Sequence, residues 1–176
     1  MEQFFYELPV PSSIADEALA FSKSNEIWHL YYNFDAAQLP VEIATKEPLF
    51  MWLADNKFDF HVGILKLPAN TCYKWHSDTD RQVGINMLLE DNGSKCLFAE
   101  NTEDVSFPVI ELVYKPSKYF VFNTRRQHTV FNFAEIRYLL TVEFLGKDRD
   151  LTYTDICNVF KDSHGYTKVY GTQSVG

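Results

Sequence analysis

The chain has 176 residues, enough for one domain with a sizeable hydrophobic core. Its formal net charge is −8 at pH 7, so a large positive surface for a nucleic-acid backbone is not expected. No apolar run approaches the ~18 residues of a membrane span, and the first residues lack the pattern of a signal peptide. Three widely spaced cysteines indicate a reduced, cytoplasmic setting rather than a disulfide framework: Cys72, Cys96 and Cys157.

Residues 1–57 are predicted to form a helical flank. In the segment 11–25, Ser12 or Ser13 is the expected N-cap, and apolar residues follow at helical spacing. In the segment 45–56, Pro48 stands near the start of a second helix, because proline is tolerated in the first turn. We therefore expect this part of the chain to supply helices that pack against a core formed by later residues.

Residues 58–145 have the pattern of short strands separated by turn residues, and Asn92-Gly93 is the strongest turn signal. The expected strands cover residues 58–67, 71–76, 82–90, 96–100, 108–114, 119–123, 128–133 and 136–146. No helix-length segment interrupts them, which predicts a mainly β, antiparallel double-stranded β-helix, or jelly roll, as the core of a single domain.

Residues 146–176 are expected to hold a C-terminal helix and tail, with Thr154 as the cap and Gly165 as the stop.

The stretch "KWHSDTDR" places His76 and Asp78 two residues apart. In an extended segment such residues point to the same side, so an imidazole nitrogen and a carboxylate oxygen can face one point. Taken alone the pair is a weak signal, because "SDTD" is also good turn sequence on a protein surface.

Two downstream residues strengthen this signal. His128 is a lone histidine between two aromatic-rich strands, and Arg137 opens a long apolar strand nine residues later. A cation in such a strand faces water, where it pairs with Glu135 or Glu143, or it faces an anion inside the protein. We expect the Arg137 strand to lie beside the His128 strand, which would put Arg137 deeper in the same cavity. The alternative for His128 is a histidine at a sheet edge that is hydrogen-bonded to the backbone.

Two histidines and one carboxylate on one face of an octahedral metal leave three positions open, the arrangement of non-haem Fe(II) oxygenases. The stretches "HSDTDRQVGINMLLED", "FVFNTRRQHTVFN" and "IRYLLTVEF" resemble the Fe(II)- and 2-oxoglutarate-dependent oxygenases, especially small members of the prolyl and aspartyl/asparaginyl hydroxylase types. The resemblance covers roughly residues 60–145. It implies a dioxygenase that hydroxylates a C–H bond with O₂ while 2-oxoglutarate is decarboxylated to succinate.

By position, the resemblance makes His76, Asp78 and His128 the iron ligands and Arg137 the partner of the distal carboxylate of 2-oxoglutarate.

The resemblance also suggests further contacts to the cosubstrate, from Tyr73, Asn86 and Thr141. Many relatives carry a hydroxyl two residues after the arginine, where this chain has Leu139. No role is assigned at this point to three further arginines: Arg81, Arg125 and Arg126.

Two other functions stay open at this point. A cupin-like metal enzyme could use the same three ligands without 2-oxoglutarate, and a non-catalytic jelly roll could bind a carbohydrate or a protein. The substrate is expected to be a small molecule or a protein side chain, and exposed sheet edges would permit a homodimer.

Overall fold

The computed structural model describes residues 3–32, 34–91 and 93–162. Its strands are β1 (Phe5–Pro11), β2 (His29–Tyr31), β3 (Phe34–Gln38), β4 (Phe60–Leu67), β5 (Thr71–His76), β6 (Val83–Leu88), β7 (Lys95–Ala99), β8 (Ile110–Leu112), β9 (Lys118–Asn123), β10 (Gln127–Asn132) and β11 (Arg137–Phe144). The helices are α1 (Ala15–Ser24), α2 (Val41–Ala44), α3 (Pro48–Asp55) and α4 (Tyr153–Asp162), with a 3₁₀ turn at Gly146–Asp148.

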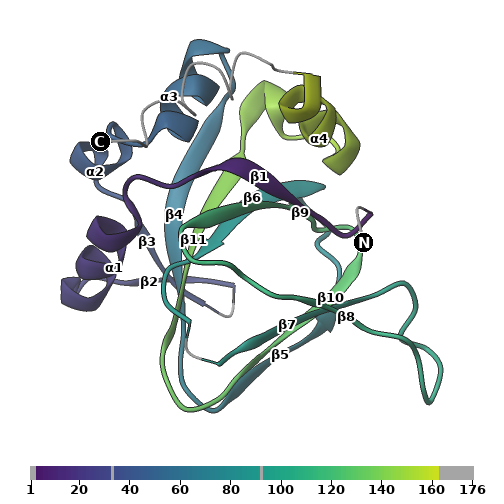
Figure 1. The fold of residues 1–176 in the computed structure, drawn as a ribbon. Helices are drawn as coiled ribbons and strands as arrows, with labels where there is room; N and C mark the ends of the chain where they lie inside the picture. The colour runs from purple at the N-terminus through teal and green to yellow at the C-terminus, as the bar shows by residue number, and fades with distance from the viewer. Residues whose placement is uncertain (1–2, 33, 92, 163–176) are drawn as a thin grey trace.

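The strands form two antiparallel sheets that face each other (Figure 1). The larger sheet has the order β1-β9-β6-β11-β4-β3-β2, and the smaller sheet has the order β5-β10-β7-β8. From β4 onward, the chain crosses between the sheets as a jelly roll requires. The predicted fold class is therefore confirmed, and a strand is present in each of the eight segments where one was expected.

The prediction that residues 1–57 are only helical or irregular is wrong. β1 pairs with β9, and β3 pairs with both β2 and β4, so this flank extends the larger sheet at both edges. The prolines of β1 obscured its pattern, but a strand at a sheet edge tolerates proline. β2 has only three residues and lies at the sheet edge, so it carries no apolar periodicity.

The three predicted helices are present, but two of their caps differ from expectation. α1 is preceded by Ile14 at its N-cap position, and Ser12 instead donates to Glu47 at 2.7 Å. At α4, Thr152 and Asp155 bond reciprocally, so the capping residue is Thr152 and not Thr154. The expected stop at Gly165 and the turn residue Asn92 lie outside the described residues.

Strand β11 shows how the fold separates core from cavity. Tyr138, Leu140, Val142 and Phe144 belong to a large apolar cluster, to which all four helices contribute (Figure 1). The alternate residues Arg137, Leu139 and Glu143 line a cavity on the other face of the sheet. Because side chains alternate along a strand, one strand supplies both the core and the cavity floor. Within the described residues, no helix is long and apolar enough to cross a membrane.

Candidate metal centre

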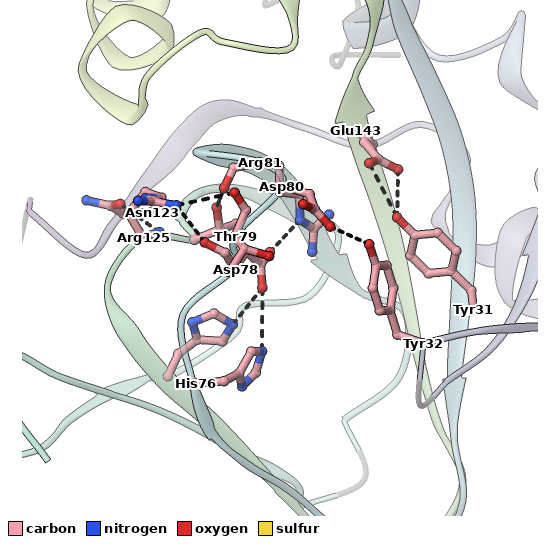
Figure 2. Close-up of polar contacts among 12 residues, drawn as sticks. Tyr31, Tyr32, His76, Asp78, Thr79, Asp80, Arg81, Asn123, Arg125 and Glu143 are labelled. Carbon is pink, nitrogen blue, oxygen red and sulfur yellow. Dashed lines mark hydrogen bonds and ion pairs between the residues drawn. The ribbon is translucent and has the colours of Figure 1, made fainter.

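Three predicted ligands come together between the ends of two paired strands. His76 ends β5 and is the register partner of His128 in β10, while Asp78 follows β5 in a loop. Asp78 Oδ1 lies 3.5 Å from His76 Nε2 and 3.9 Å from His128 Nε2 (Figure 2). One potential ligand atom from each residue falls within 4.8 Å of the others, which suits a single metal ion.

Both histidine rings are oriented by the backbone. His76 Nδ1 lies 2.7 Å from the carbonyl oxygen of Lys74, and His128 Nδ1 lies 2.8 Å from that of Arg126. A carbonyl only accepts, so each Nδ1 carries a proton, and in the neutral ring Nε2 is then the atom that presents a lone pair on the side of Asp78. This tautomer is the one a metal requires from Nε2 ligands.

Asp78 is held at both its backbone and its side chain. The Asp78 N–H donates to the carbonyl oxygen of Thr124 at 2.8 Å, and Arg125 Nη1 donates to the carbonyl oxygen of Asp78 at 3.0 Å. Arg81 Nε donates to Asp78 Oδ2 at 2.6 Å, which leaves Oδ1 as the oxygen directed toward the histidines. The structure thus gives Arg81 and Arg125 contacts that the sequence did not predict.

His128 is buried, with 6 % of its surface exposed, and packs edge-on against Phe122 at a centroid distance of 5.0 Å. Burial, with a further contribution from the neighbouring His76, lowers the pKa of His128 from 6.5 to about 4. The ring is therefore neutral at pH 7, which is the state that binds a metal.

A cavity of about 240 Å³ opens from these residues and reaches Arg137. The strand that carries Arg137 does not lie beside β10, as expected, but in the facing sheet, where it pairs with β4 and β6. Arg137 still enters the same cavity, because the two sheets enclose it from opposite sides.

Arg137 is 3 % exposed and forms no ion pair with any carboxylate in the described part of the chain. Its Nε donates to Ser94 Oγ at 3.1 Å, and its guanidinium carbon lies 5.6 Å from the centre of the Tyr114 ring. The alternative that Arg137 pairs with Glu135 or Glu143 in solvent is therefore wrong. A buried guanidinium with only neutral neighbours suits an anionic ligand.

Of the other predicted cosubstrate residues, Tyr73 and Asn86 line the cavity and Thr141 does not. Tyr73 packs edge-on against His76 at 4.3 Å, and Asn86 and Leu139 line the wall. Asn86 Oδ1 and Thr141 Oγ1 are buried without a hydrogen-bond partner among the described residues, and the two residues are register partners. Thr141 lies four residues from Arg137, about 13 Å along the strand, so it is nearer to Glu143 than to Arg137.

No family model matches the chain, and no curated protein matches it by sequence. Solved structures do. A prolyl-4-hydroxylase from Pseudomonas putida matches with a TM-score of 0.56 at 13 % identity, over 78 % of this chain and 86 % of that one. A prolyl hydroxylase from Trichoplax adhaerens, in complex with a hypoxia-inducible-factor peptide fragment, matches with a TM-score of 0.57 at 12 % identity, over 82 % and 84 %. A 2-oxoglutarate–Fe(II) oxygenase family oxidoreductase from Burkholderia pseudomallei matches with a TM-score of 0.53 at 12 % identity, over 86 % and 88 %.

The chain has the fold of these oxygenases. On this oxygenase fold, sequence reasoning placed His76, Asp78, His128 and Arg137 around one cavity, and the structure brings all four there. It missed Tyr114, whose buried hydroxyl oxygen has no hydrogen-bond partner in the described ranges and whose pKa burial raises. Nothing in the local sequence distinguishes Tyr114 from a core residue, because its neighbourhood depends on strands remote in the chain.

Proposed function

We propose that the chain is an Fe(II)- and 2-oxoglutarate-dependent oxygenase, and more narrowly a hydroxylase of a C–H bond in a small molecule or a protein side chain. The observation that carries this proposal is the convergence of His76 Nε2, His128 Nε2 and Asp78 Oδ1 at the mouth of a cavity that ends in Arg137. The likeness of fold to solved oxygenases supports it.

The three candidate ligands fit an iron ion in their residue types and in the orientation of their ligand atoms. Both imidazoles present Nε2, since Nδ1 is bonded to the backbone, and Asp78 presents one oxygen, since Arg81 occupies the other. Two imidazoles and one carboxylate are the ligand set of non-haem Fe(II) oxygenases. When bound, iron together with 2-oxoglutarate and O₂ supplies the oxidising chemistry, and 2-oxoglutarate leaves as succinate and CO₂.

Arg137 is the proposed anchor for the distal carboxylate of 2-oxoglutarate. Its guanidinium can donate to both oxygens of a carboxylate, and burial strengthens such a pair. Tyr73 and Asn86, which line the cavity, are proposed as further contacts to the cosubstrate. Thr141, the register partner of Asn86, is proposed as a contact through its buried hydroxyl. The hydroxyl of Tyr114 beside Arg137 is an additional candidate donor to the same carboxylate.

The protein's own part is to position these groups and to exclude water. Phe34, Phe122, Val130 and Leu65 supply apolar wall between the metal centre and Arg137. A dry cavity strengthens each charged contact inside it. The Trichoplax prolyl hydroxylase is in complex with a peptide fragment, and a solved α-ketoglutarate-dependent epimerase from nogalamycin biosynthesis has a similar fold. Both a protein side chain and a small molecule therefore stay within the proposal.

The cellular setting is part of the proposal. Cys72, Cys96 and Cys157 are free thiols, which agrees with the cytoplasmic location that we propose.

We also propose that two copies pair into a homodimer through an exposed sheet edge, such as β2 or β8.

The test is spectroscopic and chemical. Anaerobic addition of 2-oxoglutarate to the Fe(II)-loaded protein should produce a visible charge-transfer band, and admission of air should yield succinate. If the band is absent and no succinate forms, the oxygenase proposal is wrong.

A further inference from the structure

We propose that the cavity selects a substrate with a cationic nitrogen, either an ammonium or a guanidinium group, and that Glu143 recognises that group. This inference rests on the proposed oxygenase function, because it assigns the part of the cavity that 2-oxoglutarate would leave free.

The cavity has opposite charges at its two ends. Arg137 and Glu143 lie on the same face of β11, six residues apart and therefore about 20 Å along the strand, and both line the cavity. The Arg137 end is buried, whereas the Glu143 end lies beside Tyr32, which is 62 % exposed. A dicarboxylic cosubstrate belongs at the cationic end, so the anionic end faces whatever enters from outside.

Glu143 has no cationic partner among the residues that the structure describes. Both of its oxygens accept from the hydroxyl of Tyr31, at 3.2 and 3.3 Å (Figure 2). Burial, together with Glu143 itself, raises the pKa of Tyr31 to about 12, so Tyr31 stays a neutral donor. The charge of Glu143 contributes to the raised pKa of Arg81, but the hydrogen bond and ion pair of Arg81 go to Asp78. Glu143 therefore has no ion pair of its own within the described residues, and an added cation would supply one.

A second acceptor beside Glu143 can take a hydrogen-bond donor from the ligand. Asn86 can contact both ligands, because its Nδ2 donates to the acceptor oxygens of 2-oxoglutarate whereas its Oδ1 only accepts. Asn86 lines the cavity and is 4 % exposed, and its Oδ1 is buried without a hydrogen-bond partner in the described residues. Asn86 lies two residues from Gly84, which is the register partner of Glu143. A buried, unpaired carbonyl oxygen requires an N–H or O–H donor, and an ammonium or guanidinium group would supply one beside Glu143.

Gly84 adds no side chain next to Glu143. A Cβ placed on Gly84 would make ordinary contacts with the Val142 carbonyl oxygen at 3.5 Å, Arg81 Nη1 at 3.7 Å and Asn86 Oδ1 at 4.0 Å, so these groups lie together beside Glu143.

Two tyrosine rings complete the anionic end. Tyr31 and Tyr32 stand edge to face at 4.8 Å, and their hydroxyls point to Glu143 and to Asp80 (Figure 2). Tyr32 holds a φ of 53°, which is unfavourable for a bulky residue, and its hydrogen bond to Asp80 is 2.7 Å long. The faces of such rings attract cations, and Asp80 adds a second carboxylate at the entrance.

The inference is tested with ligand pairs that share a carbon skeleton but differ in charge. Each ligand is titrated calorimetrically into the anaerobic Fe(II) protein with 2-oxoglutarate. The pairs are lysine and norleucine, arginine and citrulline, and a blocked pentapeptide with a central lysine and its norleucine counterpart. We expect each cationic member to bind at least about tenfold more tightly than its neutral partner. The free amino acids and the peptides separate a small-molecule source of the cation from a protein side chain.

Glu143→Gln should remove the preference, and Glu143→Asp should retain most of it. Glu42→Gln, which changes net charge equally at an exposed site on α2, should leave the preference unchanged. Equal binding of charged and neutral partners, binding of neither, or a preference that survives in Glu143→Gln would overturn the inference. The charge-transfer band with 2-oxoglutarate is recorded on the same samples, so a failure of the oxygenase proposal would show separately from a failure of cation recognition.

Discussion

Arg81 Nε lies 2.6 Å from Asp78 Oδ2, on the side of the carboxylate away from the two candidate histidine ligands. The Arg81 carbonyl also accepts from Thr124 Oγ1 at 2.8 Å, and Thr124 accepts in turn from the Asp78 N–H. Asp78 is therefore oriented by a closed set of contacts before any ligand binds. Such contacts restrict a metal-binding carboxylate to one oxygen and one direction.

The first prediction concerns Arg81 as a positioning residue. Arg81→Gln should weaken Fe(II) or Co(II) binding by roughly 10- to 100-fold, because the freed carboxylate loses its orientation. Competition with a metal-sensitive dye measures the affinity, and Lys147→Gln is the control for the loss of one positive charge. Arg81→Lys should recover only part of the affinity, since lysine cannot reproduce the planar guanidinium contact. Unchanged metal affinity in Arg81→Gln would show that the contact does not orient Asp78.

The second prediction separates a 2-oxoglutarate enzyme from a cupin-like metal enzyme. Arg137→Gln should retain the metal but weaken 2-oxoglutarate binding by about 30-fold or more, because a buried charged contact is lost. Titration of the charge-transfer band measures the affinity for 2-oxoglutarate, and metal analysis of the same sample is the control. Retained 2-oxoglutarate affinity would favour the reading in which Arg137 holds another acidic ligand.

The third prediction concerns the candidate ligands themselves. His128→Ala should abolish stoichiometric Fe(II) binding, because two remaining ligands do not complete the proposed facial set. His29→Ala, at an exposed position in β2, should bind metal as the unaltered protein does. Metal content after gel filtration gives the answer, and full occupancy in His128→Ala would remove His128 from the site.

The fourth prediction concerns the pH dependence of the metal-free protein. The pKa of His128 is about 4 in the folded chain against an ordinary value of 6.5, so the unfolded chain binds the proton more readily between these values. The free energy of unfolding should be unaffected by this group above pH 6.5. It should fall as pH drops from 6.5 to 4, by a total on the order of 3 kcal/mol.

Urea denaturation of the chelator-treated protein across this range measures the slope. A His128→Gln variant lacks the titrating group and should show a flatter profile. Equal slopes in the two proteins would mean that other groups cause the acid destabilisation.

Strands with a repeating apolar pattern could be predicted from the sequence, whereas strands that depend on pairing with a neighbour could not. β4 to β11 were recognised because alternating or continuous apolar runs sit between turn residues such as Pro68 and Gly93. β1, β2 and β3 were missed. β1 and β2 are edge strands, which are stabilised by pairing with a neighbour rather than by their own pattern, and the short β3 joins β2 to β4. The cap of α1 was displaced for a similar reason, because Ser12 bonds to Glu47, which is remote in sequence. The cap of α4 differs for a local reason, because Thr152 rather than Thr154 bonds reciprocally with Asp155.

The sequence by itself determined the jelly roll, because strand periodicity is a local property of the chain. It also predicted that His76 and Asp78 face one point, but Asp78 lies in the loop after β5 and is oriented there by Arg81 and Thr124. Only the tertiary structure decided that His128 pairs with His76, that Arg137 approaches from the facing sheet, and that Glu143 stands at the opposite end of the cavity from Arg137. These relationships depend on which strands pair and in which register. Pairing is set by burial summed over the whole sheet, so no local stretch of residues contains it.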